Sequence, residues 1–287
     1  MMSPATAAFA LMAFNASMAA LDTVFVRLVA GEVHALEIAF FRNLFSLVAL
    51  LIMLKPAERN LNANGLWPIH GARAVLKLAG LIFYFMAITM LPIALVTAVA
   101  FTMPLFVTLG SWLILGERLS AHKAAALLAG LLGMLIILQP PGVEFGMGLV
   151  FALSSAMALA AVALLMKVTS GQEDPMRIAW YNLLLTVPLA LVLALPVWTW
   201  PSPIALGLMA LQGVGGLFAQ ISFARAMKLA DASLIISVDF IRLPIAAILG
   251  LALFHEPVQI WVLLGGTVIF SGVLFSAYRE RRRSRQA

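Results

Sequence analysis

Hydrophobic residues follow one another along most of this chain in long runs, and many of the prolines and charges lie in the short stretches between the runs. A helix needs about twenty consecutive apolar residues to cross the hydrocarbon core of a bilayer. The pattern therefore predicts ten membrane-spanning helices, at residues 5–28, 34–54, 67–90, 92–115, 121–139, 146–168, 176–196, 203–227, 231–253 and 258–278. The connections between them are too short to hold a soluble domain.

The second half of the chain repeats the first at an offset of about 140 residues. Residues 38–41 read Ile-Ala-Phe-Phe and residues 178–181 read Ile-Ala-Trp-Tyr, while Glu117 in the first half matches Glu256 in the second. Each half holds five predicted helices. Because five is an odd number, the second half must cross the membrane in the opposite direction to the first. An inverted repeat of this kind is typical of secondary transporters.

The predicted fold class is therefore an all-α membrane protein in which ten transmembrane helices form two inverted five-helix repeats around a central cavity. We expect a first repeat in residues 1–141, a second, inverted repeat in residues 142–278 and a basic tail in residues 279–287. Basic side chains collect at the cytoplasmic face of membrane proteins. Thirteen of the 18 Lys and Arg residues fall at one predicted face, namely Lys55, Arg59, Arg118, Lys123, Lys167, Arg177, Arg225, Lys228, Arg279, Arg281, Arg282, Arg283 and Arg285. We expect both termini at that face.

Composition agrees with the membrane prediction, since 63% of the residues are hydrophobic, 10% are charged and the mean hydropathy is +1.06. An ordinary soluble protein is excluded. The chain has no cysteine, which rules out disulfides, thiolate catalysis and Cys-ligated metals. The net charge of +6 does not indicate a nucleic-acid partner, because most of the basic residues lie at one predicted membrane face and in the tail. The expected localisation is the cell (inner or plasma) membrane, as a multi-pass protein.

Several short motifs occur twice at this spacing. In the first half they are residues 91–94 (Leu-Pro-Ile-Ala), 101–105 (Phe-Thr-Met-Pro-Leu) and 115–118 (Leu-Gly-Glu-Arg); in the second half they are residues 239–244 (Asp-Phe-Ile-Arg-Leu-Pro) and 254–257 (Phe-His-Glu-Pro). With these motifs the whole chain resembles the EamA-type members of the drug/metabolite transporter superfamily. The resemblance implies a basket-like bundle with the fifth and tenth helices at its periphery. It leaves the substrate open, because members of the superfamily carry amino acids, nucleosides, nucleotide sugars, vitamins and xenobiotics.

Ionisable side chains at membrane depth are costly, so they are expected to face the interior of the bundle or a wet cavity. On the third predicted helix His70, Arg73, Lys77, Gly80 and Tyr84 recur at spacings of three or four and share one face. Lys77 lies near mid-membrane, where it either lines a cavity or pairs with a carboxylate. The residues expected to border one central substrate cavity are Asn15, Arg42, Asn43, Lys77, Tyr84, Trp180, Gln212 and Arg242.

Mid-membrane cations outnumber mid-membrane anions in this set, which favours a substrate with a carboxylate or another anionic group. Asp22 and Asp239 are the candidates for proton or ion coupling, although Asp22 has an alternative partner in Arg27 and Asp239 has one in Arg242. Pro104 and Pro244 occupy nearly matching positions in the two halves and are candidate hinges or simple helix bends. Glu117 and Glu256 lie at helix ends, where each is expected to cap the helix that follows it.

The leading functional prediction is a secondary transporter, or permease, that moves a small metabolite by alternating access. The alternatives are a riboflavin or S-adenosylmethionine type of vitamin or cofactor carrier, and a non-transporting membrane assembly or lipid-handling protein. An enzyme is not expected, because the chain contains no HExxH or GxSxG motif and its four histidines are dispersed. We expect no metal and no cofactor. The expected partners are a small-molecule substrate and the lipid bilayer, with the protein a monomer or a homodimer.

Overall fold

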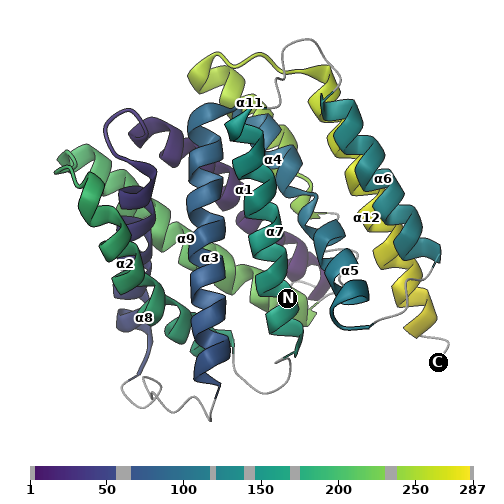
Figure 1. The fold of residues 1–287 in the computed structure, drawn as a ribbon, viewed down its shortest axis with the longest axis horizontal. Helices are drawn as coiled ribbons and strands as arrows, with labels where there is room; N and C mark the ends of the chain where they lie inside the picture. Colours follow the sequence, from purple (N-terminus) through teal and green to yellow (C-terminus); the bar gives the residue numbers. More distant parts are fainter. Residues whose placement is uncertain are drawn as a thin grey trace.

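A computed structural model describes residues 4–55, 66–116, 121–138, 146–168, 175–229 and 238–284. Every regular element in these ranges is helical (Figure 1). The α-helices are α1 (Pro4–Val29), α2 (Ala35–Met53), α3 (Trp67–Met90), α4 (Ile93–Ala100), α5 (Met103–Leu113), α6 (Ala121–Leu138), α7 (Met147–Val168), α8 (Pro175–Ala194), α9 (Pro203–Leu229), α11 (Arg242–Phe254) and α12 (Ile260–Ser284); the short 3-10 helix η2 (Leu195–Val197) follows α8.

Seven spans within the described ranges are long and apolar enough to cross a membrane. They are Thr6–Val29, Ala35–Met53, Trp67–Met90, Ile93–Leu113, Met147–Met166, Met176–Val197 and Pro203–Ala226. Three shorter apolar helices, Ala121–Ile137, Arg242–Phe254 and Ile260–Ser276, coincide with the remaining predicted spans. The all-helical membrane architecture is therefore confirmed, while the count of ten complete spans stays a prediction.

The helix predicted at residues 92–115 is wrong in one respect, because it is broken into α4 and α5. Pro104 is the second residue of α5 and has no N–H with which to continue the hydrogen-bond ladder from Ala100. The chain closes α4 with tighter bonds instead, from Phe101 N–H to Ala98 O and from Thr102 N–H to Val99 O. Proline in the first turn of a helix is well tolerated, so α5 restarts at this point.

A second break lies about 140 residues later. Residues Phe240 and Ile241 form a turn, and α11 begins at Arg242 with Pro244 in its first turn. The predicted helix at residues 231–253 therefore also departs from a single helix, although residues 230–237 lie outside the described ranges. Both breaks are followed by a half-helix with a proline near its start.

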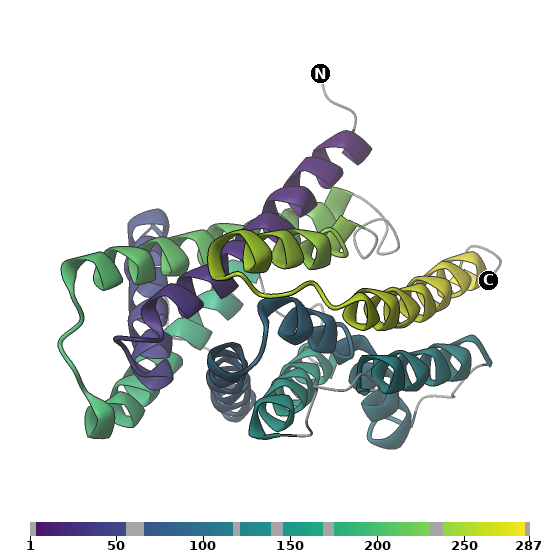
Figure 2. The same cartoon turned by 90° about the horizontal axis from the view of Figure 1, so that it is seen from above.

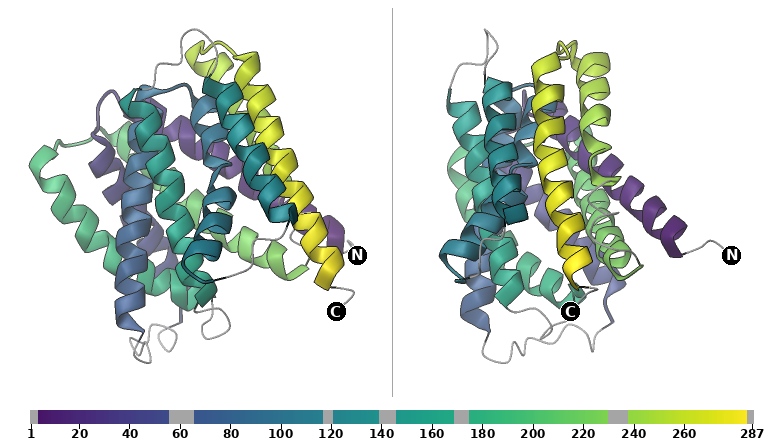
Figure 3. Two further views of the ribbon diagram at one scale, coloured as in Figure 1. Left: turned by 45° about the vertical axis from the view of Figure 1, so that its right-hand side comes forward. Right: turned by 90° about the vertical axis from the view of Figure 1, so that its right-hand side faces the viewer.

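Helices α6 and α12 lie side by side at the edge of the bundle, where α12 also contacts α4 and α6 also contacts α5 (Figures 2 and 3). Glycines allow the close approach: a Cβ on Gly133 would come within 2.6 Å of Gly265 O, and a Cβ on Gly272 would come within 2.6 Å of the Ala129 Cβ, with Ala126 next to it. At an offset of 139, Gly272 is the repeat counterpart of Gly133, and Gly265 is the counterpart of Ala126. The same contact is therefore made twice, with the roles of α6 and α12 exchanged. Contacts across a two-fold axis show this pattern.

The remaining helices form the main body of the bundle. α3 packs along α7, α1 packs along α9, and α2 lies against both α8 and α9. The half-helices α4 and α11 contact each other, and α11 also contacts α1. α4 and α11 lie near the end of the bundle that carries the turn from α3 to α4, at the top of Figure 1; we call it the α3–α4 end.

Candidate substrate cavity

A cavity of about 390 Å³ lies in the middle of the bundle. This volume is in the range of small-molecule sites in other proteins. Its wall combines a large apolar area with a smaller set of polar side chains from α1, α2, α3, α7, α9 and α11: Asn15, Asp22, Arg42, Asn43, Ser46, Lys77, Tyr84, Ser155, Gln220 and Arg242. Ala100 and Met103, on the two sides of the α4–α5 break, complete it. Pro104 has no N–H to donate to the Ala100 carbonyl, so this carbonyl lacks its usual helical partner. Such a group is tolerated within a membrane where it lines a polar cavity, and the break lies at such a place.

Six of the eight predicted cavity residues do line this space: Asn15, Arg42, Asn43, Lys77, Tyr84 and Arg242. The candidate coupling residue Asp22 lines it as well. Helical periodicity was a sufficient guide on α3, where Lys77 and Tyr84 point from the same face into the same cavity.

Trp180, Gln212 and Asp239 do not belong to the cavity wall. Trp180 is buried in a cluster that includes Leu50 of α2 and Leu217 of α9. Gln212 is buried on α9 one turn before Gly216. At that turn α9 packs closely on α2, with the Ser46 hydroxyl donating to Gly213 O at 2.8 Å.

Ser155 was missed by sequence reasoning, although a signal for it existed. It follows Asn15 by 140 residues, and the repeat predicts that both face the same space. The Ser155 hydroxyl donates to Gly80 O at 2.8 Å and so ties α7 to α3. A Cβ on Gly80 would come within 3.1 Å of the Leu159 side chain, which explains why a small residue stands at this contact.

His70 and Arg73 share the face of Lys77 but do not reach the cavity. Both are buried, and His70 Nδ1 lies 2.6 Å from an Arg73 Nη atom. The His70 ring also packs on Tyr181 with a centroid separation of 4.5 Å. These side chains therefore stabilise the contact between α3 and α8.

Among the residues that the structure describes, one ion pair lies in the cavity wall. Arg42 Nε donates to Asp22 Oδ1 at 3.1 Å, which joins α2 to α1. The sequence alternative of an Asp22–Arg27 pair is wrong, since five residues along a helix do not bring two side chains together. A Cβ on Gly216 would lie 2.8 Å from Arg42 Nη2. The absence of a side chain at Gly216 therefore makes room for the guanidinium.

Lys77 and Arg242 have no carboxylate partner among the described residues. The Arg242 guanidinium lies over the Phe101 ring, 5.0 Å from its centroid, and its Nε has no acceptor in the described part of the chain. With one carboxylate and three cations, the described wall carries an excess of positive charge.

The two helix breaks add to this positive field. Met103 and Arg242 are the first residues of α5 and α11, and both line the cavity. The N-terminus of a helix carries a partial positive charge, and neither Thr102 nor Ile241 places a capping side chain on it. The Phe101 and Phe240 rings meet between the breaks, 5.4 Å apart.

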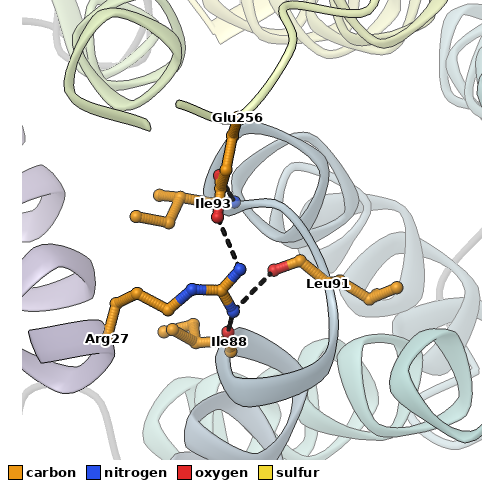
Figure 4. A network of polar contacts seen from close by, with 5 residues as sticks. All are labelled: Arg27, Ile88, Leu91, Ile93 and Glu256. Carbon is orange, nitrogen blue, oxygen red and sulfur yellow. Dashed lines mark hydrogen bonds and ion pairs between the residues drawn. The ribbon is translucent and has the colours of Figure 1, made fainter. Parts of the chain in front are cut away.

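Toward the α3–α4 end, beyond the cavity-lining residues Asp22 and Arg242, Val24, Ile93 and Ala246 form a buried apolar cluster. A polar network lies at the same end (Figure 4). Arg27 Nη2 lies 2.5 Å from Glu256 Oε1. Arg27 Nη1 donates to the carbonyls of Ile88 and Leu91, while Glu256 Oε2 accepts from Ile93 N–H at 2.8 Å.

The expectation that Glu256 caps the helix that follows it is therefore wrong, because it caps α4, which is distant in sequence. Its repeat counterpart Glu117 lies outside the described residues.

A further pair of carboxylates fixes the connection between η2 and α9 at this end of the bundle. Glu37 is fully buried and accepts hydrogen bonds from the backbone N–H and the hydroxyl of Thr199. Glu32 accepts the same two bonds from Ser202, at the surface. Buried carboxylates need such partners, so Glu37 stabilises this connection.

The sequence profile of the EamA-like transporter family matches the chain twice, over residues 6–139 and 146–278. Three relatives are named transporters. An S-adenosylmethionine uptake transporter of Rickettsia prowazekii is 24% identical over 91% of this chain and 89% of its own length. A riboflavin transporter of Vibrio cholerae is 32% identical over 76% and 74%. A pseudopaline exporter of Pseudomonas aeruginosa is 27% identical over 85% and 86%.

The fold is also similar to that of a solved crystal structure. The match has a TM-score of 0.63 and 21% sequence identity, and it covers 97% of this chain and 98% of the other. The two chains therefore share their overall arrangement of helices from end to end.

Proposed function

The chain belongs to the EamA-like transporter family, and from this premise we propose that it is a secondary transporter for a small metabolite that bears a carboxylate or another anionic group. It would move this substrate across the cell membrane by alternating access and would not act as an enzyme. The observation that carries the choice of substrate is the charge of the cavity wall.

Lys77 and Arg242 support an anionic substrate because neither has a carboxylate partner among the described residues. A cation at membrane depth is costly unless an opposite charge or water compensates it. A substrate carboxylate would supply that charge at binding. Arg42 is already engaged by Asp22, so we assign the first contact with the anion to Lys77 and Arg242 rather than to Arg42.

The proposed architecture has ten spans in two inverted repeats, residues 1–141 and 142–278, with both termini and the tail of residues 279–287 in the cytoplasm. The two family matches, one in each half, support it. So do the exchanged contacts between α6 and α12. With this topology the α3–α4 end is the outer end of the bundle.

Asp22 is the proposed site of proton coupling. It lines the cavity and its partner Arg42 would also attract a substrate anion, so substrate and Asp22 compete for one guanidinium. Asp239, the second candidate, lies away from the wall and is set aside. Pro104 and Pro244 remain candidate hinges, because each stands just after a helix break.

A riboflavin or S-adenosylmethionine carrier is the second candidate, supported by the named relatives. The two ligands differ in charge from a simple anion: riboflavin is neutral, and S-adenosylmethionine combines a sulfonium cation with an amino acid group. An excess of cations in the wall disfavours the sulfonium.

The test is a thermal-shift screen of the purified protein, followed by flux measurements in proteoliposomes for each hit. The panel contains mono- and dicarboxylates, amino acids, riboflavin, riboflavin 5′-phosphate and S-adenosylmethionine. We expect anionic compounds to stabilise the protein and to be transported, and riboflavin 5′-phosphate to exceed riboflavin. Transport restricted to neutral or cationic compounds would refute the anionic substrate. Absence of flux for every compound, with lipid bound in the cavity, would favour the lipid-handling alternative.

A further inference from the structure

We propose that Arg27 and Glu256 are gating residues: their ion pair closes the cavity at the α3–α4 end and must break when this end opens. The closure can be tested without any substrate. Only its place in a transport cycle depends on the proposed function.

The ion pair joins three segments that are far apart in sequence (Figure 4). Arg27 lies at the end of α1, its carbonyl acceptors Ile88 and Leu91 lie at the turn from α3 to α4, and Glu256 lies after α11. Both terminal nitrogens of Arg27 and both carboxylate oxygens of Glu256 are used. A planar guanidinium suits such multiple contacts, whereas a lysine would form fewer of them.

The backbone conformation around residues 250–256 places the Glu256 side chain at this position. His255 adopts a left-handed conformation with φ 54°, which is rare for a residue with a side chain. Glu256 N–H then donates to Gly250 O at 3.1 Å, which folds the chain back over the end of α11. A Cβ on Gly250 would lie 3.0 Å from Glu256 Oε2, so this glycine leaves room for the carboxylate.

Two observations favour a contact that breaks when this end opens (a gate) over a structural contact that persists in every conformation. The elements that Glu256 connects, α4 and α11, are short helices; α4 ends at Ala100 and α11 begins at Arg242, and both of these residues line the cavity. Each can therefore swing as a short unit. The pair is also partly accessible, with side-chain exposures of 24% for Arg27 and 11% for Glu256, so water can replace the partners when they separate.

Among the described residues, Arg27–Glu256 is the one ion pair that links the first half of the chain to the second, because Asp22–Arg42 lies within the first half. Separation of the two halves at this end therefore requires this pair to break. Beneath it, Val24, Ile93 and Ala246 are buried against one another and would separate along the same line.

The experiment uses the natural absence of cysteine. Ala19 on α1 lines the cavity, and Ala19→Cys provides a single reporter there. A membrane-impermeant maleimide is added to right-side-out and, separately, to inside-out vesicles, and the labelling rate is measured. We expect Glu256→Gln and Arg27→Met each to raise labelling from the α3–α4 side by about tenfold or more, since loss of a contact made in one state shifts a two-state equilibrium.

Two further results distinguish a gate from general loosening. Labelling from the opposite side should fall when labelling from the α3–α4 side rises, whereas a loosened protein would label faster from both sides. The double variant should label no faster than either single variant, because both remove the same interaction. Glu32→Gln is the matched control: it removes a carboxylate charge at the same end, where Glu32 also bonds across the halves but to the uncharged backbone N–H and hydroxyl of Ser202.

Gly250→Ala is the variant to use if the charge changes prevent insertion, because it crowds the Glu256 carboxylate and keeps both charges. It should raise labelling in the same direction and by less. If the folded variants show unchanged labelling and only a lower unfolding temperature, the ion pair serves only to stabilise the structure, and the proposal is overturned. A shift in labelling without transport of any compound would leave the gate intact and count against the proposed function.

Discussion

The two halves of the chain contribute equivalent positions to the cavity wall but unequal charge. Asn15 and Ser155 correspond at an offset of 140; Leu81 and Gln220, Tyr84 and Phe223, and Met103 and Arg242 correspond at an offset of 139, and all of them line the cavity. Yet of the four charged side chains in the described part of the wall, three belong to the first half: Asp22, Arg42 and Lys77.

One equivalent pair shows what this difference means. Lys77 corresponds to Gly216, so the first half presents an ammonium group where the second presents no side chain. The empty space at Gly216 is used by the Arg42 guanidinium of the first half. The repeat thus determines which positions face the cavity. The side chains at those positions differ between the halves: the first half provides most of the charge, and the second half provides space for the Arg42 guanidinium at Gly216.

The largest effect is expected from Arg42→Ala, which removes one of the charged side chains that the first half contributes to the cavity wall. It leaves the partly buried carboxylate of Asp22 without its charged partner, which should cost about 1–3 kcal/mol of stability. Both thermal stability in detergent and liposome uptake should fall. The double variant Asp22→Asn/Arg42→Ala should recover stability without recovering uptake. A single variant as stable as the parent protein would contradict the importance of this pair.

Lys77→Ala should weaken binding of the anionic substrate without lowering the stability of the protein. Lys77 has no carboxylate partner among the described residues, so its removal should leave the unfolding temperature unchanged or higher. Affinity for an anionic substrate should fall by about tenfold to a hundredfold, the value of a hydrogen bond to a charged group. The comparison is Gln220→Leu in the second half, expected to have the smaller effect. Equal losses would show that the charge asymmetry has no role in recognition.

Gly216→Ala should displace the Arg42 guanidinium, because the new Cβ would lie 2.8 Å from Nη2. We expect affinity for the anionic substrate to fall by about tenfold, as a small shift of a positioned cation weakens its contacts. Gly207→Ala on the same helix is the control, since nothing lies within 4 Å of its Cβ position. An effect of similar size at Gly207 would point to helix stiffening instead.

Pro104→Ala and Pro244→Ala test whether the halves are mechanically alike even though their charges differ. Each substitution restores a backbone N–H beside a break and favours a continuous helix. Both should slow transport by about threefold, with binding affinity unchanged, because hinge changes alter conformational rates. The rates come from stopped-flow uptake at saturating substrate. A loss confined to one proline would show that one half moves while the other stays fixed.

Much of the cavity was accessible from the sequence because helical periodicity is local. The spacing of Lys77 and Tyr84 places both on one face of α3, and the cost of burying charge directs that face inward. The same reasoning failed for Gln212, which lies on the face of α9 expected to line the cavity but one turn too far along it. Depth along a helix depends on where neighbouring helices cross, and periodicity does not contain that information.

By itself, the sequence determined the helical class, the position of the apolar runs and the repeat, because hydrophobicity and spacing act within one segment of chain. The tertiary structure alone decided which charges meet. Asp22 pairs with Arg42 and not with Arg27, and Glu256 caps α4 and not the helix that follows it. These choices require side chains from separate helices to arrive at the same depth and direction, and only the packing of the bundle sets both.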